Sequence, residues 1–297
     1  MEIKKYGAID IGSNAVRLLI SNVVLKENHE PKYRKVSLVR VPIRLGRDVF
    51  TKGTISDKNK KRMVDAMHAF KLLMDVHQIE KYSACATSAM RESENGKQIA
   101  KEIKDITEID IQIIDGKTEA KIIASTDLKE LIDGDKSYLY VDVGGGSTEF
   151  TFFSKGKIIE SRSYKIGTVR MLNNSDKENK KMFKEIEKWI KKTAKNLPRL
   201  ALIGSGGNIN SIFKRSGTPY GKPLSYIYMN AHYKFLKSMS YEERITELGL
   251  KPDRADVIIP ATKIYLSAMK WSGATKIYVP KIGLADGIIR SLHLGII

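Results

Sequence analysis

The chain has 297 residues, of which 42% are hydrophobic and 29% charged, a composition that excludes a disordered segment and a membrane-embedded protein. Its 52 Lys and Arg residues exceed its 34 Asp and Glu residues and give a net charge of +18. Such an excess attracts polyanions, namely nucleic acid, anionic lipid, nucleotide polyphosphates or inorganic polyphosphate. Lysine-rich, solvated helix faces account for the charge equally well, so charge alone does not identify a ligand.

Cysteine and histidine content indicates the compartment and the kind of metal. The single cysteine, Cys85, has no partner for an internal disulfide, which is typical of a reducing cytoplasm. The five histidines are scattered without ligand spacing, so we expect no zinc site and a hard metal ion held by oxygen. No run of 18 apolar residues and no export signal is present, and we expect a cytoplasmic protein with no membrane partner.

The first part of the chain alternates strands and helices. Two apolar runs about a Gly-Ser-Asn turn predict adjacent strands at 4–11 and 15–24. Ser56 then caps a helix whose Met63, Met67, Phe70 and Met74 share one face, a pattern typical of core residues. The elements expected after it are a strand at 82–89, a helix at 94–106, a strand at 109–115 and a helical stretch from Gly116.

The second part repeats the beginning of the first. AIDIG at 8–12 and YVDVG at 140–144 share the form apolar-Asp-apolar-Gly, and their aspartates, Asp10 and Asp142, mark equivalent strand ends. A repeat this long indicates duplicated lobes, since solenoid periods are much shorter. We expect an α/β fold of two related lobes with the active site in a cleft between them. The boundaries expected are 1–117 and 118–283, with a last helix at about 284–297 packing back on the first lobe.

Three glycine-rich turns follow predicted strands, at 12–14 (GSN), 144–148 (GGGST) and 204–208 (GSGGN). Without side chains in the way, the backbone N–H groups of such turns bind phosphate oxygens. Neither the Rossmann nor the Walker spacing is satisfied, and one glycine turn alone is usually only a turn. Two of them at matching positions of a duplicated lobe, each after a strand that carries an aspartate, are much more specific for phosphate.

Acidic residues flank these turns. Asp10, Asp142 and Glu149 lie at the ends of the strands that carry them, where buried carboxylates without a cation are costly. Mg²⁺ bound to a few carboxylates, water and phosphate oxygens removes that cost, with Mn²⁺ as the alternative ion. The competing interpretation is that the aspartates only accept hydrogen bonds from turn amides.

Several motifs together resemble the exopolyphosphatase and guanosine pentaphosphate phosphohydrolase family. They are AIDIGSNAVRLLI, ATSAMRESENG, KTEAKII, VDVGGGSTEF, IGSGGN and KPDRADVI, in this order and over nearly the whole chain. The resemblance implies two ribonuclease-H-like lobes of the actin and hexokinase type, in the short form without an additional helical region. It also implies a Mg²⁺-dependent phosphatase that removes the terminal phosphate from inorganic polyphosphate or from guanosine pentaphosphate.

The resemblance assigns roles to particular residues. Glu119 matches the acid that activates water, while Thr118 stands where the family has a second glutamate. Asp142 and Glu149 match metal-binding acids, and Arg91 matches a phosphate-binding arginine. The phosphate-loop positions are matched by Ser13, Asn14, Gly144, Gly145, Ser147 and Gly206.

Simpler interpretations exist for some of these residues. From the sequence alone, Glu119 is an ordinary acid at a helix start, and Arg91 is an ordinary surface ion-pair partner. Ser147 lacks a nearby histidine or lysine base in the sequence, so we expect it to donate to phosphate instead of acting as a nucleophile. Asn208 stands where many family members have threonine.

The leading hypothesis is therefore an exopolyphosphatase, with a guanosine pentaphosphate 5′-phosphatase as the alternative. A phosphotransferase to another substrate and a non-catalytic sensor that binds polyphosphate or the nucleotide are further alternatives. Nucleic acid is not an expected partner, because only the charge favours it. A homodimer is kept as a candidate assembly. Basic residues of the second lobe are expected to line the path of a polyphosphate chain, namely Lys165, Arg170 and Lys214.

Overall fold

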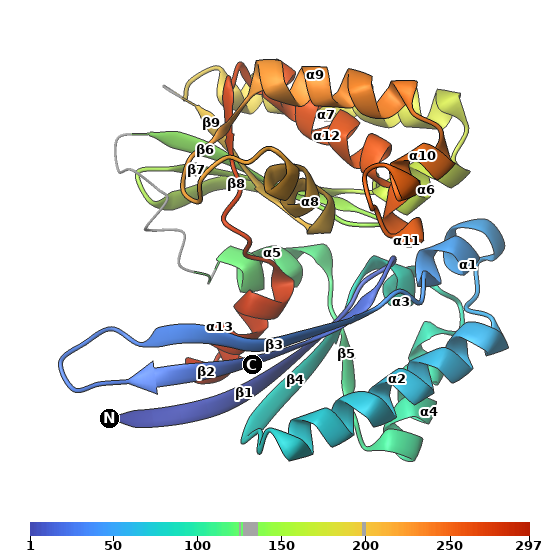
Figure 1. Cartoon of the computed structure of the whole chain (residues 1–297), viewed down its shortest axis with the longest axis vertical. Coiled ribbons are helices and arrows are strands. Elements are labelled where there is room, and N and C mark those ends of the chain that lie inside the picture. Colours follow the sequence, from blue (N-terminus) through green and yellow to red (C-terminus); the bar gives the residue numbers. More distant parts are fainter. Residues whose placement is uncertain (125, 127–135, 198–199) are drawn as a thin grey trace. The chain divides into compact units, whose positions relative to one another are not determined.

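The chain forms two α/β units in a computed structural model that describes residues 1–124, 126, 136–197 and 200–297 (Figure 1). The first unit consists of Met1–Thr126 together with Gly283–Ile297. The second contains the described residues from Lys136 to Ile282. Each unit has its own sheet and its own apolar core. Within the described part of the chain, no helix is both long and apolar enough to cross a bilayer.

A five-stranded sheet forms the centre of the first unit. Its order is β3-β2-β1-β4-β5, with β1, β2 and β3 antiparallel in succession and β4 and β5 parallel to β1. The strands are β1 (Glu2–Ile11), β2 (Val16–Leu25), β3 (Lys32–Val41), β4 (Lys81–Ala86) and β5 (Ile111–Ile113). The inner end of β1 is buried without interruption, as expected for a central strand covered on both faces.

Helices cover both faces of this sheet. Figure 1 shows α2 and α4 on one face and α13 on the other. The helices are α1 (Leu45–Lys52), α2 (Asp57–Val76), α3 (Ser88–Glu92), α4 (Gly96–Thr107), α5 (Gly116–Ala124) and α13 (Leu284–His293). The methionine and phenylalanine stripe of α2 is buried in the core, as its spacing indicates. The boundary expected at 117/118 falls inside α5, and the packing of α5 against α13 keeps the whole helix in the first unit.

A six-stranded sheet forms the centre of the second unit, in the order β10-β11-β9-β6-β7-β8. Its strands are β6 (Ser137–Val143), β7 (Thr148–Ser154), β8 (Lys157–Tyr164), β9 (Ala201–Ser205), β10 (Leu224–Ser225) and β11 (Lys276–Tyr278). The hairpin between β7 and β8 turns at Lys155 and Gly156, both with positive φ. Its helices are α6 (Thr168–Asn173), α7 (Asp176–Ala194), α8 (Gly207–Arg215), α9 (Tyr226–Ser238), α10 (Tyr241–Thr246), α11 (Pro252–Ala255) and α12 (Ile258–Ser272).

The two sheets share one topology. The order β3-β2-β1-β4-β5 matches β8-β7-β6-β9-β11 strand by strand, including which pairs are parallel and which antiparallel. The predicted α/β class with two related lobes is therefore confirmed. The sequence interpretation missed β3, and it extended two strands too far. The strand expected at 82–89 ends at Ala86, because Ser88 already begins α3, and the one expected at 109–115 is reduced to β5.

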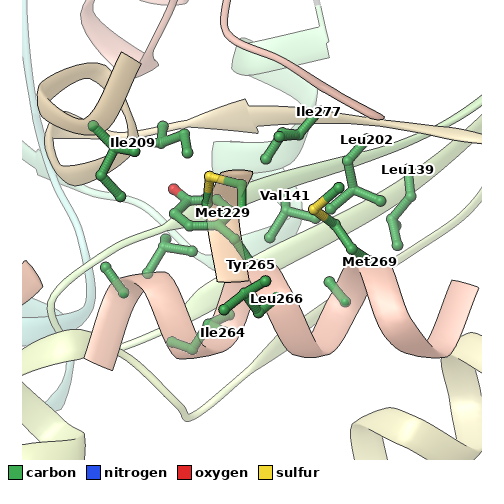
Figure 2. Close-up of a cluster of buried hydrophobic side chains, with 14 of the residues drawn as sticks. Leu139, Val141, Leu202, Ile209, Met229, Ile264, Tyr265, Leu266, Met269 and Ile277 are labelled. Atoms are coloured by element: carbon green, nitrogen blue, oxygen red, sulfur yellow. The ribbon is translucent and has the colours of Figure 1, made fainter. Parts of the chain in front are cut away.

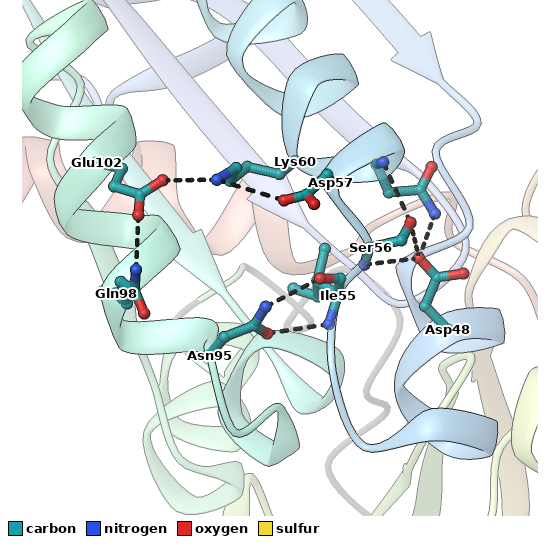
Figure 3. A network of polar contacts seen from close by, with 9 residues as sticks. Asp48, Ile55, Ser56, Asp57, Lys60, Asn95, Gln98 and Glu102 are labelled. Atoms are coloured by element: carbon teal, nitrogen blue, oxygen red, sulfur yellow. Dashed lines mark hydrogen bonds and ion pairs between the residues drawn. The ribbon is translucent and has the colours of Figure 1, made fainter.

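A polar network fixes the start of α2 (Figure 3). Ser56 caps the helix by accepting from the Asn59 amide, as predicted. Asp48 of α1 in turn accepts from the Ser56 amide at 3.0 Å, from the Ser56 hydroxyl at 2.5 Å and from the Asn59 side chain at 2.8 Å. Partial burial raises the pKa of Asp48, but these hydrogen bonds and the charge of Lys52 outweigh it, so the pKa lies below its usual value.

We predict that Asp48→Asn lowers the free energy of unfolding by about 1–3 kcal/mol at neutral pH, because a hydrogen-bonded carboxylate is lost. A carboxylate with a lowered pKa stabilises the fold above its unfolded pKa of about 4, and this contribution is lost as the pH falls through the lowered pKa. The difference in the free energy of unfolding between native protein and Asp48→Asn, measured by urea unfolding, should therefore become smaller in acid.

Asp65→Asn is the matched control, since Asp65 of α2 forms an exposed ion pair with Lys61 at 3.0 Å. It should cost less than about 1 kcal/mol. If the difference in the free energy of unfolding between native protein and Asp48→Asn stays constant down to pH 2, the role given to the Asp48 carboxylate is contradicted.

Candidate active site

Each unit places an aspartate near the end of its central strand, opposite a residue of the neighbouring antiparallel strand. Asp10 of β1 lies opposite Arg17 of β2, and Asp142 of β6 lies opposite Glu149 of β7. Residues directly opposite each other in such a pair project from the same face of the sheet. The duplication thus keeps the position of the aspartate and changes its partner.

In the first unit the partner is a cation. Arg17 Nη1 lies 2.5 Å from Asp10 Oδ2, and Asp10 is only 6% exposed. A buried carboxylate requires a compensating charge, which the guanidinium supplies here. Arg17 is not among the site residues predicted from the sequence.

In the second unit the partner is another acid. Glu149 is 2% exposed, and its Oε1 accepts hydrogen bonds from Ser147 Oγ at 2.7 Å and Ser163 Oγ at 2.9 Å. Like charges directly opposite each other on a sheet are destabilising, and a cation near both would offset that cost. Two carboxylates in this position fit a hard divalent cation that keeps several of its waters. Throughout the described residues, no group of three or more His, Cys, Asp or Glu side chains is arranged to hold a metal.

The glycine turn of the second unit is fixed from one side by α6. The Gly144 carbonyl accepts from the Thr168 amide at 3.0 Å, and the Gly145 carbonyl accepts from the amides of Val169 and Arg170 at 2.9 and 3.0 Å. The Arg170 side chain also donates to the Gly146 carbonyl at 2.7 Å.

These bonds decide where the turn amides point. Carbonyl and following N–H lie in one plane and point in opposite directions in a trans peptide. With three successive carbonyls directed at α6, the amides of Gly145, Gly146 and Ser147 are directed away from it. Within the described part of the chain, no backbone acceptor bonds to the amides of Gly145 and Gly146. The turn therefore presents donors suited to an anion, as its glycines predict.

The turn of the first unit is built in the same way. Gly12 donates to the Ala15 carbonyl at 3.1 Å, just as Gly144 donates to the Ser147 carbonyl at 3.0 Å. The Ser13 carbonyl accepts from the Gly46 amide at 2.7 Å, at the start of α1. The Ser13 side chain is buried, and its hydroxyl shares a 2.9 Å hydrogen bond with the Ser88 hydroxyl.

Two glycines that were not predicted from the sequence, Gly46 and Gly167, allow these close approaches. A β-carbon on Gly167 would lie 2.5 Å from the backbone carbon and oxygen of Gly145, and one on Gly46 would lie 2.9 Å from the β-carbon of Ser13. Gly46 and Gly167 each follow a basic and an aliphatic residue, in RLG and KIG. This repeated basic-aliphatic-Gly pattern is the sequence signal that could have identified both glycines.

The third glycine turn leads from β9 into α8. Gly206 is the N-cap of α8, with a φ of 112° that side chains rarely adopt. A β-carbon here would lie 3.0 Å from the Val143 carbonyl and 3.5 Å from Asp142 Oδ1. The predicted residue Gly206 thus lies beside the acid pair, and the N-terminal amides of α8 begin at this point.

Asn14, the other predicted residue of the first turn, accepts a hydrogen bond on its carbonyl from the Arg44 amide at 3.1 Å. The predicted residues Arg91 and Glu119 lie together in the same unit. Glu119 is in the first turn of α5 and 7% exposed, and Arg91 Nη1 lies 4.0 Å from its Oε2. Arg91 also donates to the Ile114 carbonyl at 2.7 Å, which directs its guanidinium toward this acid. The buried position of Glu119 disagrees with the simpler interpretation of a solvent-facing helix-start acid.

Cys85 of β4 is adjacent to this group and pairs in register with Asp10. Burial, followed by the negative charges of Asp10 and Glu119, raises the pKa of the Cys85 thiol to about 11, against a hydrogen bond from Ser83. A thiol with a raised pKa keeps its proton at neutral pH, which does not favour Cys85 as a nucleophile.

Comparisons with known proteins identify relatives over nearly the whole length. A family model described as the Ppx/GppA phosphatase family matches residues 23–295. The bifunctional 3-dehydroquinate synthase/phosphatase of Fusobacterium nucleatum is 30% identical over 92% of this chain, which spans 44% of that protein. Exopolyphosphatase 2 of Mycobacterium tuberculosis is 24% identical over 98% of this chain and 99% of its own length. The resemblance seen in the sequence and the predicted class of phosphoanhydride hydrolase are confirmed.

A solved structure agrees with the fold. The crystal structure of an exopolyphosphatase from Cytophaga hutchinsonii superposes with a TM-score of 0.85 at 25% identity and covers 98% of both chains.

We predict that Gly167→Ala weakens orthophosphate binding at least about 10-fold, measured by calorimetry. A β-carbon at position 167 would displace the backbone of Gly145 and so reorient the amides of the glycine turn that face the anion. The matched control is Gly156→Ala in the β7–β8 turn, where a β-carbon meets open space but φ is 72°. It should lower stability by about 1–2 kcal/mol and leave the binding constant unchanged. Equal phosphate binding by native protein and Gly167→Ala would show that this turn does not hold the anion.

Proposed function

Because the chain belongs to the Ppx/GppA phosphatase family, we propose that it is an exopolyphosphatase, which releases orthophosphate from the end of inorganic polyphosphate. The observation that carries the proposal is the arrangement in the second unit, where a turn with outward-directed amides is flanked by two opposed carboxylates, Asp142 and Glu149. The turn amides, together with a divalent cation held by the two carboxylates, suit polyphosphate, because each unit of that chain is a negatively charged phosphate.

Hydrolysis of a phosphoanhydride needs an oriented water, neutralised phosphate oxygens and a stabilised leaving group. In this proposal Glu119 of the first unit accepts the proton of the attacking water, and Arg91 beside it binds the terminal phosphate. The amides of Gly145, Gly146 and Ser147 in the second unit donate to phosphate oxygens.

Asp142 and Glu149 would hold Mg²⁺, which supplies charge neutralisation on phosphate oxygens when bound, and Mn²⁺ is the alternative ion. Asp10 already forms an ion pair with Arg17, so we propose that it supports the first turn through that pair. The basic surplus of the chain, net +18, would attract polyphosphate before it is cleaved. Of the basic residues expected along its path, Arg170 also braces the Gly146 carbonyl.

Replacing the acid that receives the proton should slow turnover without removing substrate binding. We predict that Glu119→Gln lowers the rate of phosphate release from polyphosphate by about 10²- to 10⁴-fold. The matched control is Glu102→Gln, since Glu102 forms an ion pair with Lys60 at 3.1 Å on the surface of the same unit. Comparable rates for native protein and Glu119→Gln would refute the role of Glu119.

The same assay separates the proposed substrate from the alternative. Polyphosphate and guanosine pentaphosphate are compared as competing substrates of the native protein. The proposal expects the larger kcat/KM for polyphosphate, and a larger value for the nucleotide would replace it with the 5′-phosphatase.

The carboxylate pair is tested through the metal. We predict that Asp142→Asn raises the Mg²⁺ concentration needed for half-maximal phosphate release by at least about 10-fold, because one of two charged ligands becomes neutral. Glu187→Gln on α7 removes only an exposed pair with Lys191 at 2.6 Å and should leave that concentration unchanged. An unaltered Mg²⁺ requirement in Asp142→Asn would exclude this acid as a ligand.

A further inference from the structure

A buried tyrosine hydroxyl supports the third glycine turn. Tyr265 of α12 is 0% exposed, and Figure 2 shows its ring within an apolar cluster that includes Val141, Leu202 and Met229. A phenyl ring would satisfy such a core, whereas a hydroxyl there is costly unless it is hydrogen-bonded. The Tyr265 hydroxyl donates to the main-chain carbonyl of Ser205, the last residue of β9.

Ser205 links this bond to the acid pair. It is the register partner of Asp142 in the parallel pairing of β6 with β9. The next residue is Gly206, and the position that its β-carbon would occupy lies 3.4 Å from Tyr265 Oη and 3.5 Å from Asp142 Oδ1. The hydroxyl and the carboxylate therefore approach the same glycine, at the point where α8 begins.

The carbonyl and the hydroxyl of Ser205 are both engaged. Its carbonyl accepts from Tyr265, and its hydroxyl donates to the Ile282 carbonyl at 2.8 Å. Burial and the negative charge of Asp142 raise the pKa of Tyr265 well above its usual value, so its hydroxyl keeps the proton that it donates. A strand end held at two points cannot rotate its last peptide freely, and that peptide positions Gly206.

We propose that Tyr265 is a positioning residue: through the Ser205 carbonyl its hydroxyl holds Gly206 and the first turn of α8 in place beside Asp142. This inference rests on the proposed function, since it assigns Asp142 to the metal. Tyr265 does not contact the reacting atoms in this account. Its effect is exerted on the geometry of the carboxylate and of the amides that follow Gly206.

The test is Tyr265→Phe, which removes one oxygen and keeps the ring in the core. The matched control is Tyr138→Phe, because Tyr138 is also buried and lies on β6, four residues before Asp142 and hence about 13 Å along the strand. Three quantities are measured for native protein and both variants: the melting temperature, the Kd for Mn²⁺ by calorimetry with orthophosphate present, and kcat and KM for polyphosphate.

The inference expects Tyr265→Phe to bind Mn²⁺ about 10- to 100-fold more weakly, as happens when groups behind metal ligands are removed. Its kcat should fall with little change in KM, while Tyr138→Phe keeps both the native Kd and the native kcat. If Tyr265→Phe retains the native Mn²⁺ affinity, or if it loses affinity only in proportion to a melting-temperature loss that Tyr138→Phe shares, the inference is wrong.

The binding measurement separates this inference from the proposed function. Suppose that Tyr265→Phe binds Mn²⁺ more weakly than the native protein, but that the native protein releases no phosphate from polyphosphate. This result would support the positioning role of Tyr265 and reject the exopolyphosphatase activity. Phosphate release by native protein that does not bind Mn²⁺ would overturn the positioning role and leave the activity standing.

Discussion

The bonds between the start of α6 and the carbonyls of the glycine turn are the constraint on which the candidate site depends. Carbonyl oxygens directed at a helix N-terminus leave the amides of Gly145, Gly146 and Ser147 directed the other way. Only a residue without a β-carbon at position 167 lets the two backbones come this close. The turn is thus pre-organised for an anion before any ligand arrives, and so little ordering entropy opposes binding.

The duplicated scaffold makes the chemical difference between the units clear. Both have an aspartate near the end of the central strand, a glycine turn after it, and a later glycine pressed against that turn. The residue opposite the aspartate is Arg17 in one unit and Glu149 in the other. A cation lies against the first acid, whereas the second acid lies opposite another acid. In this account the acid pair of the second unit binds the metal.

Much of this organisation could be predicted from the sequence, because the repeat of apolar-Asp-apolar-Gly reports both the duplication and the position of the site. Gly46 and Gly167 were missed because a single glycine after a strand has the same appearance whether it turns the chain or admits another backbone. Tyr265 was missed because its spacing within α12 is that of a core residue, and its acceptor is a backbone atom of Ser205, 60 residues earlier. The role of Arg17 likewise depends on strand register, which local sequence does not report.

The central claim is that water attacks the terminal phosphorus of a polyphosphate chain. Its most direct test is hydrolysis of polyphosphate of defined length in ¹⁸O-water with Mg²⁺, followed by ³¹P NMR and mass spectrometry of the products. The account predicts orthophosphate with one ¹⁸O per released phosphate, and chains that shorten from the end. Orthophosphate without the label, fragments from internal cleavage, or intact chains after incubation would contradict it.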